Sequence, residues 1–163
     1  MKRILFSIFS IALIALLSCN YSKGVKKDLS TGLSASYNGL SMDDIYLADA
    51  DGNRLNNNRI PLGNKITIVA TGIDYFETKE GKVFPGCSIL LIDKNKKEVL
   101  NLPDAFSELA NGTPIDEAKT LQASLNTGNP MVVGETYHLS VRFFDKNKKE
   151  SEILADVDIL MKE

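Results

Sequence analysis

The segment GETYHLSVRFF, residues 134–144, decides the fold that we expect for this chain. From Tyr137 onward every second side chain is apolar, up to Phe143, and the residues between them include His138, Ser140 and Arg142. Successive side chains of a β-strand point to opposite faces, so this alternation predicts a strand with one buried face. Helical periodicity is scarce in the residues around it.

Other segments repeat the alternation, or are short apolar runs bounded by Gly, Asn, Asp or Pro: 33–40, 43–49, 65–73, 87–93, 98–102, 120–125 and 152–161. Such segments are typical of short strands joined by turns. We therefore predict an all-β fold, an antiparallel sandwich of about seven or eight strands. It contains at most one short helix, near residues 103–110, where Pro103 fits a helix start and Gly112 fits a stop.

Residues 134–141 read G-x-x-Y-x-L-x-V, which resembles the start of strand F in immunoglobulin-like and fibronectin type III-like domains. The resemblance implies that Tyr137 forms a tyrosine corner, in which the hydroxyl bonds back to the preceding loop. The chain departs from antibody-type domains because it has no Trp and no cysteine pair to join the two sheets. The resemblance thus implies a divergent immunoglobulin-like sandwich.

The N-terminus has the features of a targeting segment. Lys2 and Arg3 precede an apolar run over residues 4–17, which is shorter than the roughly 20 residues of a membrane-spanning helix. The run ends in LLSC, residues 16–19, which resembles the lipobox of bacterial lipoproteins. This resemblance implies a signal peptide over residues 1–18 and a lipidated Cys19 that anchors the mature protein in a membrane.

The stretch after Cys19 is polar and contains two glycines. We predict a lipid-anchored tether over residues 19–32 and the sandwich domain over residues 33–163. In many lipoproteins an Asp directly after the cysteine signals retention in the inner membrane. Asn20 stands there instead, so we expect the bacterial cell envelope as the location and favour the outer membrane.

Charge and motifs exclude several classes of function. The net charge is −2, and loss of Lys2 and Arg3 would bring the mature chain to about −4, so we expect no nucleic-acid partner. No nucleophile-elbow, zinc-protease or phosphate-loop motif is present. Cys87 begins an apolar run and is interpreted as a buried hydrophobic residue. With His138 as the single histidine, we expect no enzyme activity, no metal and no cofactor.

The hexapeptide DKNKKE occurs twice, at residues 93–98 and 145–150, each time after an apolar strand. We interpret both copies as turns: Asp caps nearby amides, Asn tolerates the left-handed conformation and Lys keeps the turn solvated. A merged cluster of the lysines that binds anions is the alternative. If the first copy joins strands C and C′ and the second joins F and G, the copies lie at opposite ends, which argues against a merged cluster.

A candidate binding surface lies where the polar excursion of residues 74–86 meets the second hexapeptide. Its members are Tyr75, Phe76, Lys79, Lys82, Lys146 and Lys148. Loops at one end of a sandwich are a usual recognition site. The pattern fits a partner interface or a loop folded over its own core, and the second interpretation is favoured.

From these observations we predict a non-enzymatic, lipid-anchored envelope protein that interacts with another envelope protein. A module that binds glycan or another envelope polymer is the alternative.

Overall fold

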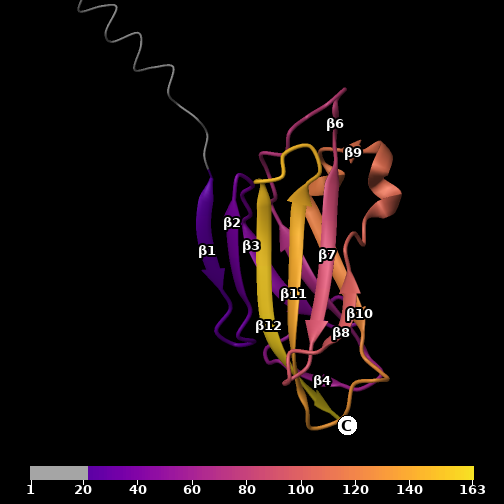
Figure 1. Ribbon diagram of the computed structural model, residues 1–163. Helices are drawn as coiled ribbons and strands as arrows, with labels where there is room; N and C mark the ends of the chain where they lie inside the picture. Colours follow the sequence, from indigo (N-terminus) through magenta and orange to yellow (C-terminus); the bar gives the residue numbers. More distant parts are fainter. Residues whose placement is uncertain (1–21) are drawn as a thin grey trace, which may run out of the picture.

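The computed structural model describes residues 22–163, which form two packed β-sheets (Figure 1). The larger sheet has seven strands in the order β1-β2-β12-β11-β7-β8, and β4 pairs with β12 outside this path. The smaller sheet has three strands in the order β10-β5-β3. Neighbouring strands run antiparallel in both sheets, apart from the parallel pair β4 and β12. The predicted all-β antiparallel sandwich is therefore confirmed.

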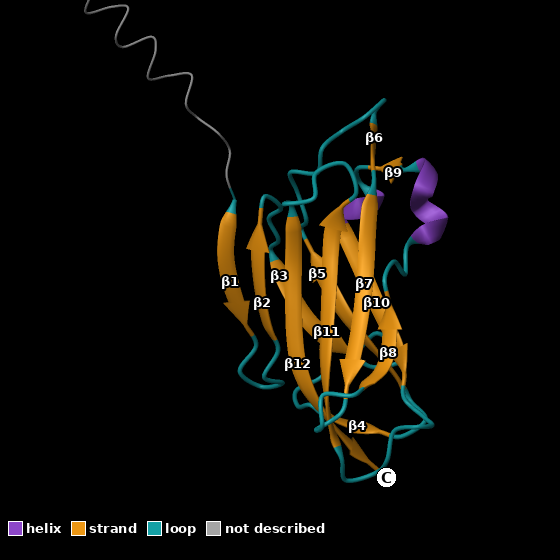
Figure 2. Ribbon diagram, viewed as in Figure 1, coloured by secondary structure: helices purple, strands orange, loops and turns teal. Residues whose placement is uncertain are grey.

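Figure 2 shows that strands dominate and that helix is confined to short pieces. The strands of the larger sheet are β1 (Lys23–Lys27), β2 (Ser34–Asn38), β4 (Arg59–Pro61), β7 (Pro85–Ile92), β8 (Glu98–Leu102), β11 (Thr136–Asp145) and β12 (Glu152–Lys162). The smaller sheet contains β3 (Asp44–Ala48), β5 (Lys65–Thr71) and β10 (Thr120–Asn126), and the short strands β6 (Lys82–Val83) and β9 (Thr113–Pro114) pair with each other. The helical pieces are the 3₁₀ helices η2 (Ser107–Asn111) and η3 (Glu117–Lys119).

The order of the strands matches an immunoglobulin-like layout. In the larger sheet, the neighbouring strands β12, β11, β7 and β8 correspond to immunoglobulin strands G, F, C and C′. In the smaller sheet, β10, β5 and β3 correspond to strands E, B and A. The chain then crosses between the sheets, because β3 pairs with β5 whereas β4 pairs with β12. Residues 136–144 of the alternating segment GETYHLSVRFF lie in β11, in the centre of the larger sheet.

The core lies between the two sheets and follows the period-2 pattern. Phe143 and Leu139 of β11 and Ile153 of β12 are almost completely buried, as are Leu47 of β3 and Ile68 of β5. All belong to one continuous cluster of buried side chains. Burial of apolar surface between the sheets therefore supplies the main stabilisation of the fold.

The N-terminal boundary of the domain differs from the prediction. Within the expected tether, residues 23–27 form β1, which pairs antiparallel with β2 from Lys23 opposite Asn38 to Lys27 opposite Ser34. The segment KGVKK has one apolar residue, Val25, and gives no period, because this edge strand is held by backbone pairing and not by a buried face. The sandwich therefore begins at Lys23 and not at residue 33.

Three other strands were missed because two or three residues are too short to show a period: β4, β6 and β9. The short helix expected near 103–110 is present as η2, in the 3₁₀ form. The predicted signal peptide over residues 1–18 and the lipidated Cys19 lie outside the described residues. Across residues 22–163, no helix has the length and apolarity required to cross a membrane.

The two hexapeptides form turns at opposite ends of the larger sheet. In the β7–β11 ladder, Ile92 lies opposite His138 and Pro85 lies opposite Asp145. The turn that follows β7 and the turn that follows β11 are therefore separated by the length of the strands. This separation agrees with the C–C′ and F–G interpretation and keeps the two groups of lysines apart.

The first hexapeptide and the unrelated segment 49–53 adopt the same turn. The Asp93 carboxylate accepts hydrogen bonds from the amides of Asn95 (2.8 Å) and Lys97 (2.9 Å). The Asp49 carboxylate accepts from the amides two and four residues further on, both at 2.9 Å. The left-handed residue is not the expected asparagine: it is Lys96, with φ 63°, at the position that Gly52 occupies in the other turn.

The left-handed Lys96 yields the first prediction. Left-handed backbone is unfavourable by roughly 1–2 kcal/mol for residues with a Cβ, and Gly avoids that strain at some cost in chain entropy. We therefore expect Lys96→Gly to raise the free energy of unfolding by about 0.5–1 kcal/mol in urea denaturation. Lys148 occupies the same place in the second hexapeptide without a positive φ, so Lys148→Gly is the matched control and should not stabilise. Equal effects of the two substitutions would contradict this explanation.

Candidate functional site

The structure brings together the two segments from which the candidate surface was predicted. The Glu77 amide donates a hydrogen bond to the Asp145 carboxylate at 2.6 Å, and the Lys146 amide donates to the Phe84 carbonyl at 2.9 Å. Asp145 is fully buried, and its second oxygen accepts from the Asn147 amide at 2.9 Å. The first residue of the hexapeptide thus fixes the excursion against the β11–β12 turn.

The six predicted surface residues divide into two groups. Phe76 is 7% exposed and belongs to the core, and Lys146 is half-buried in contacts with the loop after β8. The other four are exposed, and Tyr75 has 48% of its surface accessible: Tyr75, Lys79, Lys82 and Lys148. We call these four residues the F–G end. The excursion therefore folds partly over its own core, and its remaining side chains face solvent.

Lys146 is held by Asp104. Its Nζ lies 2.8 Å from Asp104 Oδ2 and donates to the Phe106 carbonyl at 2.8 Å. The other Asp104 oxygen accepts from the Cys87 amide (3.2 Å) and the Phe106 amide (2.9 Å). Burial would raise the pKa of Asp104, but the Lys146 hydrogen bond, the two amides and the Lys146 charge outweigh it, and the pKa is lowered. One lysine of the second hexapeptide is thus structural.

The lowered pKa of Asp104 predicts that the free energy of unfolding depends on pH. A carboxylate with a folded-state pKa below its unfolded value of about 3.9 stabilises the protein above that value, and the stabilisation disappears as pH falls through the folded-state pKa. At pH 7 we expect Asp104→Asn to lose about 1–2 kcal/mol of unfolding free energy, because Lys146 keeps no charged partner. The difference from wild type should shrink below about pH 4 in denaturation series.

Asp116→Asn is the control for this experiment. Asp116 also forms an ion pair, with Lys119 at 3.1 Å, but its side chain is 84% exposed. Exposed pairs contribute about 0–1 kcal/mol, so the control should be nearly neutral at every pH. A pH-independent loss in Asp104→Asn would contradict the assigned role of the carboxylate.

The chain enters the sandwich beside the F–G end. The Gly39 amide donates to the Ser22 carbonyl at 2.8 Å, and Asn38 Nδ2 donates to the Glu150 carbonyl at 2.7 Å. Asn38 also pairs with Lys23 on one side and with Glu152 on the other. In Figure 1, β1 accordingly begins at the end of the molecule that carries the turn between β11 and β12.

A second candidate site, not predicted from the sequence, lies on the outer face of the smaller sheet. It is a hollow of about 250 Å³, lined mainly by Tyr46, Thr67, Gln122 and the turn Asp49–Gly52. Tyr46 and Gln122 lie opposite Val69 from its two sides, so three strands supply the floor. The Thr67 and Ser124 hydroxyls are hydrogen-bonded at 2.9 Å. The outward-facing Tyr46 was the only signal of this site in the sequence. The alternation of side chains does not show that the turn Asp49–Gly52 lies beside Tyr46.

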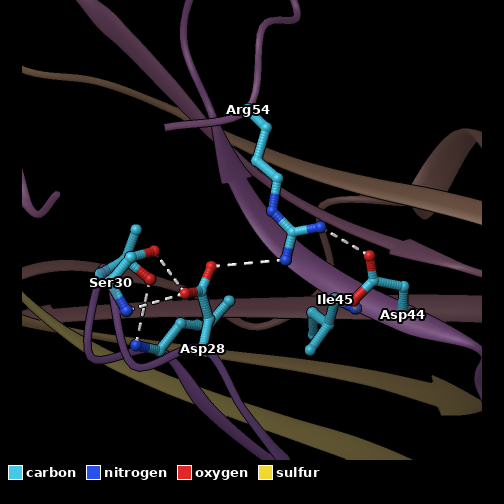
Figure 3. Close-up of polar contacts among 7 residues, drawn as sticks. Asp28, Ser30, Asp44, Ile45 and Arg54 are labelled. Carbon is cyan, nitrogen blue, oxygen red and sulfur yellow. Dashed lines mark hydrogen bonds and ion pairs between the residues drawn. The ribbon is translucent and has the colours of Figure 1, made fainter. Parts of the chain in front are cut away.

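Arg54 lies against Tyr46, one of the residues that line this hollow: its guanidinium carbon is 4.9 Å from the centre of the Tyr46 ring. The Arg54 nitrogens contact Asp44 at 2.8 Å and Asp28 at 3.4 Å (Figure 3). Ser30 donates to Asp28 from its hydroxyl and its amide, and the hydroxyl hydrogen bond is the largest cause that lowers the pKa of Asp28. Arg54 thus ties the β1–β2 turn of the larger sheet to β3 of the smaller one.

The remaining reactive residues have structural surroundings. Cys87 is fully buried, and burial, followed by the nearby Asp104 charge, raises its pKa to about 12. His138 lies on the outer face of β11, 2.8 Å from Asp158 and 3.4 Å from Asp156. The Tyr137 hydroxyl accepts a hydrogen bond from the Val132 amide at 3.0 Å, the contact of a tyrosine corner. Between residues 22 and 163, no three metal-binding side chains lie close enough to share an ion.

No family model matches the chain, and no curated protein matches it. Among solved structures, the crystal structure of the C-terminal domain of Wzt is similar to it, with a TM-score of 0.51 and 9% sequence identity. The similarity covers 88% of this chain and 79% of that one. At this level of identity the comparison shows a shared β-sandwich fold and nothing about the site.

Proposed function

We propose that this protein is a non-enzymatic, lipid-anchored interaction module of the bacterial envelope, held at the surface of its membrane, with the outer membrane favoured. The observation that supports this most is the position of β1, which starts at Lys23. Residues 20–22 alone then separate a lipidated Cys19 from the sandwich. The four residue-to-residue steps from Cys19 to Lys23 span at most about 14 Å, so the domain stays beside the membrane.

The short link restricts where a partner is found. Two or three acyl chains on Cys19 would hold the protein in the bilayer almost permanently. A partner is then a protein of the same membrane, met near the F–G end. Tyr75 offers an exposed aromatic ring, and Lys79, Lys82 and Lys148 are exposed cations of the excursion and of the β11–β12 turn. Aromatic residues at protein surfaces are common anchors of interfaces.

Site-specific photo-crosslinking in intact cells tests this function. A photoreactive amino acid in place of Tyr75 should give an adduct of defined mass with one envelope protein. The same amino acid in place of Asn57, an exposed residue before β4 at the other end, should give none. The adduct should also be lost in the Cys19→Ser background, because the domain no longer stays at the membrane. Absence of an adduct at Tyr75, or equal adducts at both positions, would contradict the proposal.

A glycan-binding module remains the second candidate function, and the hollow on the smaller sheet favours it. An aromatic ring, carboxylates and an amide meet there, which are side chains suited to a sugar. If this candidate is right, binding to purified envelope polysaccharide should be lost in Tyr46→Ala and kept in Tyr75→Ala. Absence of polysaccharide binding by the wild-type protein would reject it.

A further inference from the structure

Edge strands carry unpaired backbone groups, and three of the four sheet edges are blunted. β1 bears Lys23, Lys26 and Lys27, charges that oppose pairing with another strand. β8 is short, and its ladder with β7 shifts register between Leu91 and Ile92. β3 is partly covered by the following loop, whose Leu55 amide donates to the Leu47 carbonyl at 2.8 Å. These are the usual devices that keep edges from associating.

The fourth edge, β10, has none of these devices. Its sequence TLQASLN contains no charge, no proline and no glycine, and it pairs with β5 in unbroken register over seven residues. Its exposed side chains are uncharged and polar: Thr120, Gln122, Ser124 and Asn126. Within residues 22–163, no backbone hydrogen bond joins β10 to any segment other than β5. An open, uncharged and regular edge of this kind favours pairing with another chain.

We propose that β10 is a homodimerisation strand, which pairs antiparallel with β10 of a second copy about a two-fold axis at Ala123. This register places Leu121 opposite Leu125 on the inner side. On the outer side it places Thr120 opposite Asn126 and Gln122 opposite Ser124, so no charges meet. The sequence of the strand is thus complementary to itself, and the two smaller sheets become one six-stranded sheet.

The charges on β1, an edge strand of the larger sheet, argue for β10 as the dimerisation strand. A two-fold axis at Val25 of β1 would place Lys23 opposite Lys27 twice, and like charges directly opposite each other are destabilising. Beside β10 lies a hollow of about 310 Å³, lined in part by Phe106, Leu109 and Leu121. A second copy on the β10 edge lies next to this partly apolar surface and shields it from water.

The symmetry is compatible with a common membrane. The two-fold axis of an antiparallel strand pair stands perpendicular to the sheet, so both copies of the larger sheet lie on one side of the joined smaller sheets. Lys23 belongs to the larger sheet. The two copies of Lys23 therefore lie on the same side of the joined smaller sheets, at opposite ends along the strand direction. One bilayer that runs along the outer faces of the two larger sheets accommodates both Cys19 anchors. The dimer does not depend on the identity of the envelope partner.

Sedimentation equilibrium of the full-length chain, purified in detergent, tests the proposal. The wild-type protein should show a monomer–dimer equilibrium in the micromolar range. In Gln122→Lys/Ser124→Lys, lysines face each other across the axis, and the dissociation constant should rise at least about tenfold. Mixed with Gln122→Glu/Ser124→Glu, this variant should form a heterodimer, because every lysine then faces a glutamate.

A matched control separates the edge from a general effect of charge. Ser34→Lys/Ser36→Lys has the same spacing on β2, which is paired on both sides, and should leave the equilibrium unchanged. Thermal melts establish that each variant is folded. A monomeric wild-type protein at 100 micromolar would overturn the proposal, as would a dimer that persists in Gln122→Lys/Ser124→Lys or a mixture that forms no heterodimer.

Discussion

Phe143→Ala should lower the free energy of unfolding by about 3–5 kcal/mol, the usual effect of removing a large buried aromatic side chain. Phe143 is fully buried near the C-terminal end of β11, between two neighbouring strands. Its ring stacks on Phe106, with 6.2 Å between the ring centres, so the core and the loop after β8 both lose contacts. Urea denaturation followed by circular dichroism measures the effect.

The adjacent Phe144 provides the control, because it has the same chemistry on the opposite face. Its ring covers Gly86 on the neighbouring strand, and the Arg142 guanidinium lies 4.5 Å from its centre. Phe144→Ala should therefore lose no more than about 2 kcal/mol, mainly the cation–π contact and the partial burial. A larger loss in Phe144→Ala than in Phe143→Ala would mean that the strand has the opposite facing, which would overturn the register of the sandwich.

Cys19→Ser should move the whole population of the protein out of the membrane fraction, or leave it there only as an unprocessed precursor. The hydroxyl of serine cannot take the place of the thiol that carries the lipid, and each buried CH₂ of a lost acyl chain removes about 0.8 kcal/mol of membrane affinity. Fractionation by ultracentrifugation, followed by immunoblotting, measures the change.

Cys87→Ser is the control for the anchor, since Cys87 is the buried cysteine of the domain. This variant should stay in the membrane fraction, even though burial of a hydroxyl in the core lowers its stability. Membrane localisation of fully processed Cys19→Ser protein would contradict lipidation at this residue.

The fold was predictable where one side of a strand is buried. In β11 every second residue from Tyr137 to Phe143 is apolar and buried, and the same holds in β12 from Ile153 to Met161, although the outward-facing Leu154 and Leu160 are also apolar. β1 was not predictable, because KGVKK is held by backbone hydrogen bonds to β2, which leave no pattern in the side chains.

The candidate site was predictable only in part. The meeting of the excursion with the second hexapeptide followed from the expected topology, and the buried Asp145 carboxylate is what joins them. The roles of single residues did not follow, since Lys146 is paired with Asp104, which lies about forty residues earlier in the chain. The same is true of Arg54, whose partners Asp28 and Asp44 come from two different segments.

The most direct measurement of the central claim is mass spectrometry of the protein extracted from membranes and digested with trypsin. Lipid anchoring beside β1 predicts that the mature N-terminal peptide is Cys19–Lys23, with a diacylglycerol on the Cys19 sulfur. An intact N-terminus with an unmodified Cys19, or cleavage at another residue, would contradict the anchor and with it the position of the sandwich at the membrane surface.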